Sequence, residues 1–89
     1  MEGCRLIRQV RAVYPREAKK ERIQGTICLN VLITKAGEVR DLSVLKGGDP
    51  RLVAAALKAV SQWRYSPCVF NSEPVEIKTQ IDINFTLNQ

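Results

Sequence analysis

The 89-residue sequence contains no histidine, and its three cysteines form no C-x-x-C pair. Histidine is the commonest general base and the usual partner of a catalytic cysteine, so papain-type and most acid–base catalysis is not expected. The cysteines and carboxylates also lack the spacing of a metal site. Gly47-Gly48 is not followed by the Lys-Ser/Thr of a phosphate-binding loop. We therefore expect neither an enzyme nor a cofactor.

Long apolar runs are also missing, and a typical run is the short stretch Leu52–Leu57. A membrane-spanning helix needs about 20 apolar residues, so we expect none in this sequence, and no signal peptide is visible. If the native protein is exported or anchored, we expect the responsible segment to lie outside this sequence.

Acidic residues are fewer than basic ones, which gives a net charge of +5. Such an excess suits nucleic acid or an anionic envelope polymer, but a solvated basic face is the simpler interpretation. Nucleic-acid sites also interleave exposed aromatic residues, and most of the few aromatics here are expected to be buried. We therefore expect no nucleic-acid partner, although binding that falls steeply with salt would support one.

The three cysteines are Cys4, Cys28 and Cys68, so at least one thiol is free or pairs with another chain. Cys28 and Cys68 could meet in space, but the sequence leaves the pairing open.

The clearest pattern is the alternation of apolar and polar residues from Val75 to Leu87. Side chains alternate between the faces of a strand, so this segment predicts one buried and one solvated face. Thirteen residues at the strand rise span roughly 40 Å, which is long for a small domain. A strand longer than its neighbours leaves backbone groups unpaired, and these can accept a strand from another chain.

The other elements follow from local signals. Pro at a first helical turn and Asp at an N-cap each mark a helix start, and Gly in a short linker marks a hairpin. We predict a helix from Tyr14-Pro15 to before Gly25, a strand over 26–34, a turn over 35–38, a strand over 39–45 with a bulge near Arg40-Asp41, a helix from Asp49-Pro50 to Arg64 or Tyr65, and a loop over 67–74.

These elements predict an α+β fold with the order α-β-β-α-β. A right-handed crossover places the last strand beside the first, which gives a three-stranded antiparallel sheet of order 2-1-3 with two helices on one face. The long last strand is then an edge. We expect residues 1–13 to be an extended or loosely helical lead-in segment and residues 14–89 to be the domain.

Several motifs resemble the C-terminal domain of TonB-type energy transducers. They are Tyr14-Pro15-x-x-Ala18, Ile23-Gln24-Gly25-Thr26-Ile27, Gly37-Glu38-Val39, Val44 through Gly47-Gly48, Ala55-Ala56-Leu57-x-x-Val60-x-x-Trp63-Arg64-Tyr65-x-Pro67, Pro74-Val75 and Ile81-x-Ile83-x-Phe85-x-Leu87. One departure is Ser72, which stands where the family usually has Gly. A turn with positive φ is disfavoured for Ser, so we expect a different loop shape there.

The resemblance implies a periplasmic domain whose parent protein is anchored in the inner membrane. It would bind the TonB box, a short extended peptide of outer-membrane transporters, by strand addition. It would pass on energy from the proton gradient through an ExbB–ExbD-type complex, for uptake of nutrients such as siderophores or cobalamin. The membrane helix and Pro-rich linker usual in the family are not seen in this sequence.

The expected peptide-binding residues lie on the last strand: Lys78, Gln80, Ile81, Asp82, Ile83, Asn84, Phe85 and Thr86. Tyr14 and Pro15 are expected as secondary contacts. Trp63, Tyr65, Leu57 and Val60 are expected in the core. Two alternatives remain, a strand-exchanged homodimer through the same edge and an envelope interaction module without transporter coupling.

Overall fold

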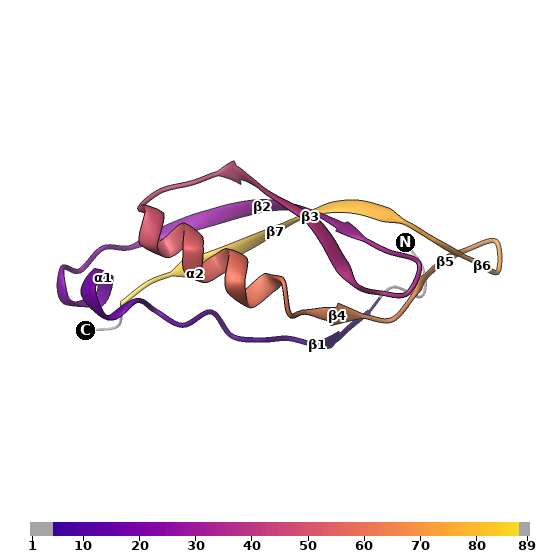
Figure 1. Ribbon diagram of the computed structural model, residues 1–89, viewed down its shortest axis with the longest axis horizontal. Helices are drawn as coiled ribbons and strands as arrows, with labels where there is room; N and C mark the ends of the chain where they lie inside the picture. Colours follow the sequence, from indigo (N-terminus) through magenta and orange to yellow (C-terminus); the bar gives the residue numbers. More distant parts are fainter. Residues whose placement is uncertain (1–4, 88–89) are drawn as a thin grey trace.

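The computed structural model describes residues 5–87. Its centre is a three-stranded antiparallel sheet of order β3-β2-β7, built from β2 (Gly25–Ile33), β3 (Val39–Lys46) and β7 (Ile77–Phe85) (Figure 1). Helix α2 (Pro50–Val60) crosses one face of the sheet, and the short helix α1 (Arg16–Lys20) lies at one end of the elongated molecule, which measures 49 × 21 × 17 Å. The predicted fold class and strand order are confirmed.

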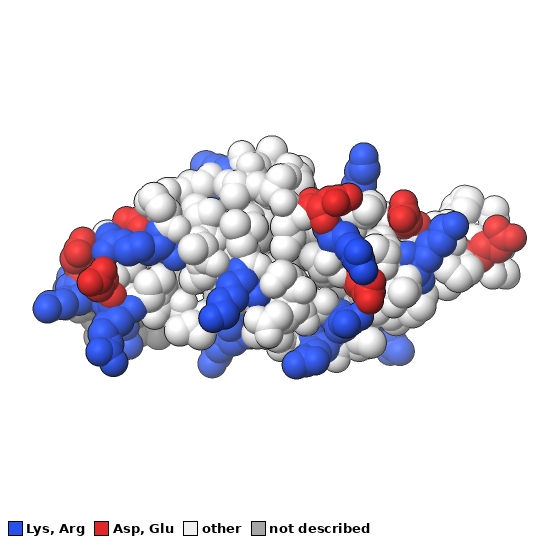
Figure 2. All heavy atoms as spheres, viewed as in Figure 1, with Lys and Arg blue, Asp and Glu red and all other residues white. Residues whose placement is uncertain are grey.

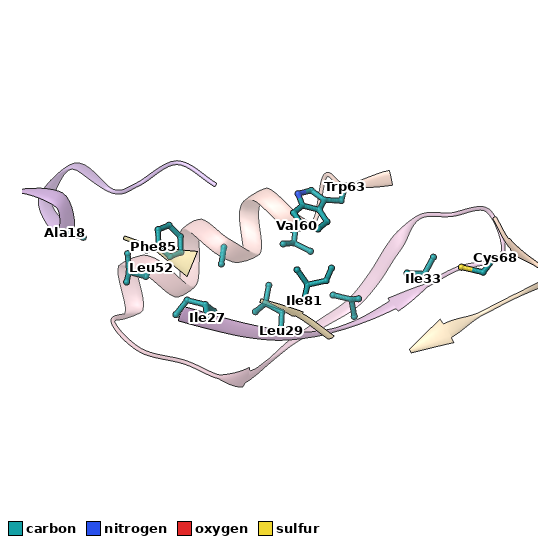
Figure 3. Close-up of a cluster of buried hydrophobic side chains, with 12 residues drawn as sticks. Ala18, Ile27, Leu29, Ile33, Leu52, Val60, Trp63, Cys68, Ile81 and Phe85 are labelled. Carbon is teal, nitrogen blue, oxygen red and sulfur yellow. The ribbon is translucent and has the colours of Figure 1, made fainter. Parts of the chain in front are cut away.

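The core lies between β2, β7 and α2. Every second residue of β2 from Ile27 to Ile33 is buried, and Leu52, Ala56 and Val60 of α2 pack over this row (Figure 3). Burying one such aliphatic side chain contributes about 1.5–3 kcal/mol. The alternation that predicted the strands thus places their apolar faces under α2.

Helix α2 begins as predicted and ends earlier than predicted. The Asp49 carboxylate accepts the Arg51 backbone N–H at 2.8 Å, and Pro50 is the first helical residue. The helix ends at Val60 rather than at Arg64 or Tyr65, because the chain closes with a tighter turn in which Trp63 N–H donates to the Val60 carbonyl. Arg64–Tyr65 form strand β4 instead.

Strand β4 pairs with β1 (Leu6–Arg8), so part of the predicted lead-in is extended and hydrogen-bonded. The Tyr65 N–H also donates to the Gly37 carbonyl at 2.8 Å. These distant partners satisfy backbone groups that a longer helix would have paired locally.

Helix α1 is shorter than predicted. Arg22 has a φ of 59°, and the Ile23 N–H returns to the Ala18 carbonyl at 2.8 Å, which closes the helix before Gly25. Strand β3 contains the predicted bulge. Its register against β2 shifts between Asn30 and Leu32, and Asp41 has a φ of 52°.

The predicted loop over 67–74 is mostly a hairpin of β5 (Cys68–Phe70) and β6 (Glu73–Val75). Its turn residues Asn71 and Ser72 have φ values of 52° and 67°. Ser72 thus adopts a positive φ in spite of its cost to Ser. The expected difference in loop shape from the family stays a prediction.

Strand β7 is also shorter than the predicted Val75–Leu87. It has nine residues, as β2 does, and Val75 belongs to β6. The pairing ends where β2 ends, so the strand is limited by its partner.

Cys28 is a free thiol and Cys68 is disulfide-bonded, so the suggested contact between these two cysteines is not a disulfide. Cys4 lies outside the described residues.

Candidate functional site

The candidate site is the outer edge of β7. All nine β7 residues pair with β2 in one register, from Ile77 opposite Ile33 to Phe85 opposite Gly25. Within the described residues no strand pairs with the other side of β7. In an antiparallel edge strand, alternate residues direct their N–H and C=O groups away from the sheet. This edge can therefore accept a further strand.

A groove of about 550 Å³ separates the C-terminal half of β7 from the lead-in segment. The β7 side contributes residues 82–85 together with Thr86. The other side is formed by Gln9, Val10, Arg11 and Ala12 of the lead-in, followed by Tyr14. The edge therefore does not face open solvent along its whole length, because part of it faces a second, extended piece of the same chain.

Aromatic side chains line the groove and hold the lead-in in place. The Tyr14 ring meets the Phe85 ring edge to face, with centroids 5.4 Å apart and an interplanar angle of 84°, and the Tyr14 hydroxyl donates to the Ile23 carbonyl. Trp63 is 7% exposed, and its indole N–H donates to the Val10 carbonyl at 2.8 Å. These contacts fix both sides of the groove within the chain, and a groove ordered in this way would need less ordering on binding a ligand.

The polar rim of the groove is tied across the sheet. Asn84 accepts a hydrogen bond from the Thr26 hydroxyl at 2.7 Å. Asp82 lies opposite Cys28, and its hydrogen bond to the thiol, with burial and its negative charge adding to the effect, raises the pKa of Cys28. The thiol therefore stays protonated at neutral pH and donates to the carboxylate.

The structure brings together only part of the predicted peptide-binding set. Asp82, Ile83, Asn84, Phe85 and Thr86 line the groove. Lys78 and Gln80 line a different hollow of about 430 Å³, shared with Asn30, Leu32, Asp41 and Ser43. Ile81 is buried in the core, with 8% of its surface exposed.

Of the predicted secondary contacts, Tyr14 lines the groove and Pro15 does not. Trp63 and Val60 are buried as expected, and Tyr65 and Leu57 are half-buried against the core. In Figure 3 the side chains of Trp63, Ile81 and Phe85 all lie on the α2 side of the sheet.

Sequence reasoning missed Gln9, Val10, Arg11 and Ala12 as one side of the groove. Only a weak signal was available, namely an apolar–basic lead-in segment without helix caps followed by Tyr14-Pro15. The hydrogen bond that fixes this segment beside β7, from the Trp63 indole N–H to the Val10 carbonyl, joins residues 53 positions apart in the chain.

Among residues 5–87, no helix is long and apolar enough to cross a membrane. The same residues contain no group of three or more metal-ligating side chains.

Comparison with known proteins agrees with this architecture. A solution NMR structure of the Pseudomonas aeruginosa TonB CTD superposes with a TM-score of 0.84 at 24% identity, covering 100% of this chain and 91% of that one. The Helicobacter pylori TonB-CTD structure gives a TM-score of 0.55 at 24% identity, covering 88% and 71%. At these identities the two likenesses show the fold.

Sequence comparison identifies the family. Protein TonB of Vibrio cholerae serotype O1 is 32% identical over 80 residues, which are 89% of this chain and 33% of that protein. Protein TonB of Xanthomonas campestris pv. campestris is 30% identical over 76 residues, 84% of this chain and 34% of that protein. This chain thus spans about a third of the length of these relatives.

The family model for the Gram-negative bacterial TonB protein C-terminal region matches residues 10–87, which run from the lead-in segment to just beyond β7. This chain belongs to the family of C-terminal domains of Gram-negative bacterial TonB proteins.

Proposed function

We propose that this domain captures the TonB box of an outer-membrane transporter by adding it as a strand to the outer edge of β7. The observation that carries the proposal is the unbroken nine-residue pairing of β7 with β2. Among the described residues no strand pairs with the outer edge of β7, which faces a groove lined by aromatic residues. Main-chain hydrogen bonds supply affinity in strand addition, and pockets for alternate side chains supply selectivity.

The groove suits a short extended peptide. Alternate peptide side chains would point toward Phe85 and Tyr14 or toward the rim at Asp82 and Asn84. The peptide therefore needs an apolar residue at every second position near the C-terminal half of β7, and it needs little specific sequence elsewhere.

We further propose that the domain works within a longer, membrane-anchored transducer. In that protein an ExbB–ExbD-type complex would supply energy from the proton gradient, and the periplasmic domain would transmit force to the transporter during nutrient uptake. A strand held along its whole length by main-chain bonds resists a pull along its axis, because the bonds must shear together. Family membership and the β7 edge support this role.

The test begins with the molecular mass of the chain in solution, followed by a backbone-amide NMR titration with a TonB-box peptide. We expect a monomer whose amide shifts concentrate over residues 77–87 and over residues 9–14, which form the other side of the groove. Two matched peptides, N-methylated at alternate residues in the two opposite phases, keep every side chain. One of the two should lose binding, because its methyl groups replace the N–H donors that face β7.

Equal binding of both methylated peptides would show that side chains, and not an added strand, hold the ligand. Shifts confined to β3 would place the peptide on the wrong edge. A dimer whose β7 amides are already protected would favour the second candidate function, pairing of this edge with a second copy of the chain.

A further inference from the structure

A second groove, of about 370 Å³, shares Trp63 in its lining with the groove beside β7. The side chains of Arg8, Arg40 and Arg64 line it together with a single carboxylate, that of Glu38. Figure 2 shows Lys and Arg side chains over the β1 and β4 region with acidic side chains between them. The groove thus holds two positive charges more than its own carboxylate compensates.

The carboxylate of Glu38 is already used on both oxygens. Oε1 accepts from Arg40 at 2.8 Å and Oε2 from Arg64 at 3.2 Å. These two guanidinium groups lower the pKa of Glu38, the Arg40 hydrogen bond having the largest effect. Glu38 therefore stays ionised at neutral pH and holds the two arginines side by side. Within residues 5–87 their remaining side-chain N–H groups have no protein acceptor.

Arg8 has no such partner. It lies directly opposite Arg64 in the β1–β4 pair, and like charges directly opposite each other on neighbouring strands are destabilising. Within residues 5–87 its side chain makes no ion pair. The antiparallel pair that ties the lead-in to the domain thus brings two arginines together across one ladder position.

We propose that this arginine groove binds carboxylates of an acidic protein segment, at a site separate from the β7 edge. Guanidinium groups present forked donors that fit a carboxylate through two parallel hydrogen bonds. A carboxylate placed between Arg8 and Arg64 relieves their repulsion, and a second one fits the free donors of Arg40. The proposal does not depend on the proposed function of β7.

The lining of the groove favours a peptide over other anions. A single inorganic ion would fill little of 370 Å³ and would leave one of the spread guanidinium groups without a partner. A nucleic acid strand would need exposed aromatic faces on which to stack its bases, and the tryptophan at this groove, Trp63, is only 7% exposed. The charge of Glu38 also disfavours the closely spaced phosphates of a nucleic acid more than the carboxylates of a peptide, which neutral residues can separate.

The probe is an acetylated, amidated hexapeptide of alternating Asp and Gly, with the Asn-Gly hexapeptide as its uncharged counterpart. Binding is followed by NMR through the arginine side-chain Nε–Hε signals and the backbone amides of the whole chain. We expect shifts at Arg8, Arg40 and Arg64 with the Asp peptide and none with the Asn peptide.

Arg8→Gln should weaken the Asp peptide about tenfold, since it removes one charge-assisted pair. Arg8→Lys should bind the Asp peptide with an affinity between those of the parent protein and of Arg8→Gln, because lysine keeps the charge but lacks the forked donors of the guanidinium group. The matched control is Arg16→Gln, an exposed position on α1 at the far end of the molecule that loses the same charge. Arg16→Gln should leave the affinity for the Asp peptide within about twofold, because Arg16 lies farther from the arginine groove than the Debye length.

Equal weakening by Arg8→Gln and Arg16→Gln would mean that only the net charge matters, and the site would be rejected. Inorganic phosphate that gives the same shifts and displaces the peptide at equal concentration would reduce the groove to a simple ion site. A single-stranded oligonucleotide that binds the same residues more tightly than the peptide would also overturn the proposal. The β7 amides report separately in each titration, so failure here leaves the β7 proposal untouched.

Discussion

The two edges of the sheet differ in how well they could accept another strand. Strand β7 keeps one register over nine residues, and its exposed side chains alternate regularly with buried or half-buried ones. Strand β3 shifts register twice against β2, and Asp41 at the bulge has a φ of 52°. Bulges twist an edge away from a would-be partner. Within residues 5–87 no strand pairs with the outer side of β3 or of β7, and β7 is the more regular of the two edges.

The edges also differ in what lies beside them. The β7 edge faces the groove formed with the lead-in segment. At the start of β3, the Glu38 carboxylate forms ion pairs with Arg40 of β3 and with Arg64 of β4. The β7 edge thus borders a groove, whereas the β3 edge borders exposed ion pairs and has an irregular backbone. Substitutions that disturb one edge and leave the other as a reference test this difference.

The largest effect is expected from Trp63→Ala, which removes a buried ring and the bond that fixes Val10 beside β7. Truncating a buried Trp costs roughly 3–5 kcal/mol, so the domain should unfold or become marginal in a urea titration. Phe70→Ala is the control, because Phe70 is 68% exposed and its loss should change stability by about 0.5 kcal/mol or less. A stable Trp63→Ala protein that merely lost peptide binding would contradict this assignment.

Gly37→Ala disturbs the β3 side. A Cβ at this position would lie 1.9 Å from the Tyr65 carbonyl oxygen, and the φ of 86° is unfavourable for alanine. Strain and overpacking together should cost roughly 2–4 kcal/mol. Gly48→Ala adds a Cβ at an ordinary 3.5 Å from Ile27 and should cost much less. Equal midpoints of chemical denaturation for the two variants would show that the hairpin can move away from β4.

Acid should loosen the β3 edge before the β7 edge. The hydrogen bond and charge of Arg40, followed by those of Arg64, lower the pKa of Glu38 below its ordinary 4.5. A lowered folded-state pKa contributes stability above pH 4.5, and this contribution is lost as the pH falls through the folded value. Amide exchange measured from pH 5 downward should therefore speed up around Glu38 and β4 first. Glu38→Gln, already uncharged, should remove this pH dependence.

Ser72→Gly should give the smallest effect, a gain of about 0.5 kcal/mol, because it relieves a left-handed serine in the hairpin that leads into β7. Ser61→Gly is the control with the opposite sign, since Ser61 has a right-handed φ of −61°. Thermal unfolding of the two variants checks the sign. A Ser72→Gly protein less stable than the parent would mean that the serine side chain makes a compensating contact.

Prediction from sequence worked where one element carries its own signal. The alternation in 26–34 and in the last strand identified β2 and β7 and their buried faces, since the side-chain period of a strand is local. Asp49-Pro50 predicted the start of α2, because the Asp49 carboxylate accepts a hydrogen bond from the Arg51 N–H in the first turn of the same helix. The bulge in β3 showed as a break in the same alternation. The strand order then followed from the handedness of the crossover.

The candidate site was predictable only in part, because half of it comes from distant residues. The sequence indicated residues 82–86 as an edge, but Gln9–Ala12 face them only after Trp63 binds Val10. The same holds for the early end of α2, where Arg64 and Tyr65 pair with β1 instead of continuing the helix.

The sequence by itself therefore determined the three strands of the central sheet, the helix starts, the sheet order and the family, because each rests on local periodicity or on motifs that can be read in order. Tertiary structure alone decided the length of β7, which is set by its nine partners in β2. It also decided the positive φ of Ser72 and the meeting of Arg8 with Arg64. These features depend on pairing between segments far apart in the chain, and that pairing overrides the preferences of single residues.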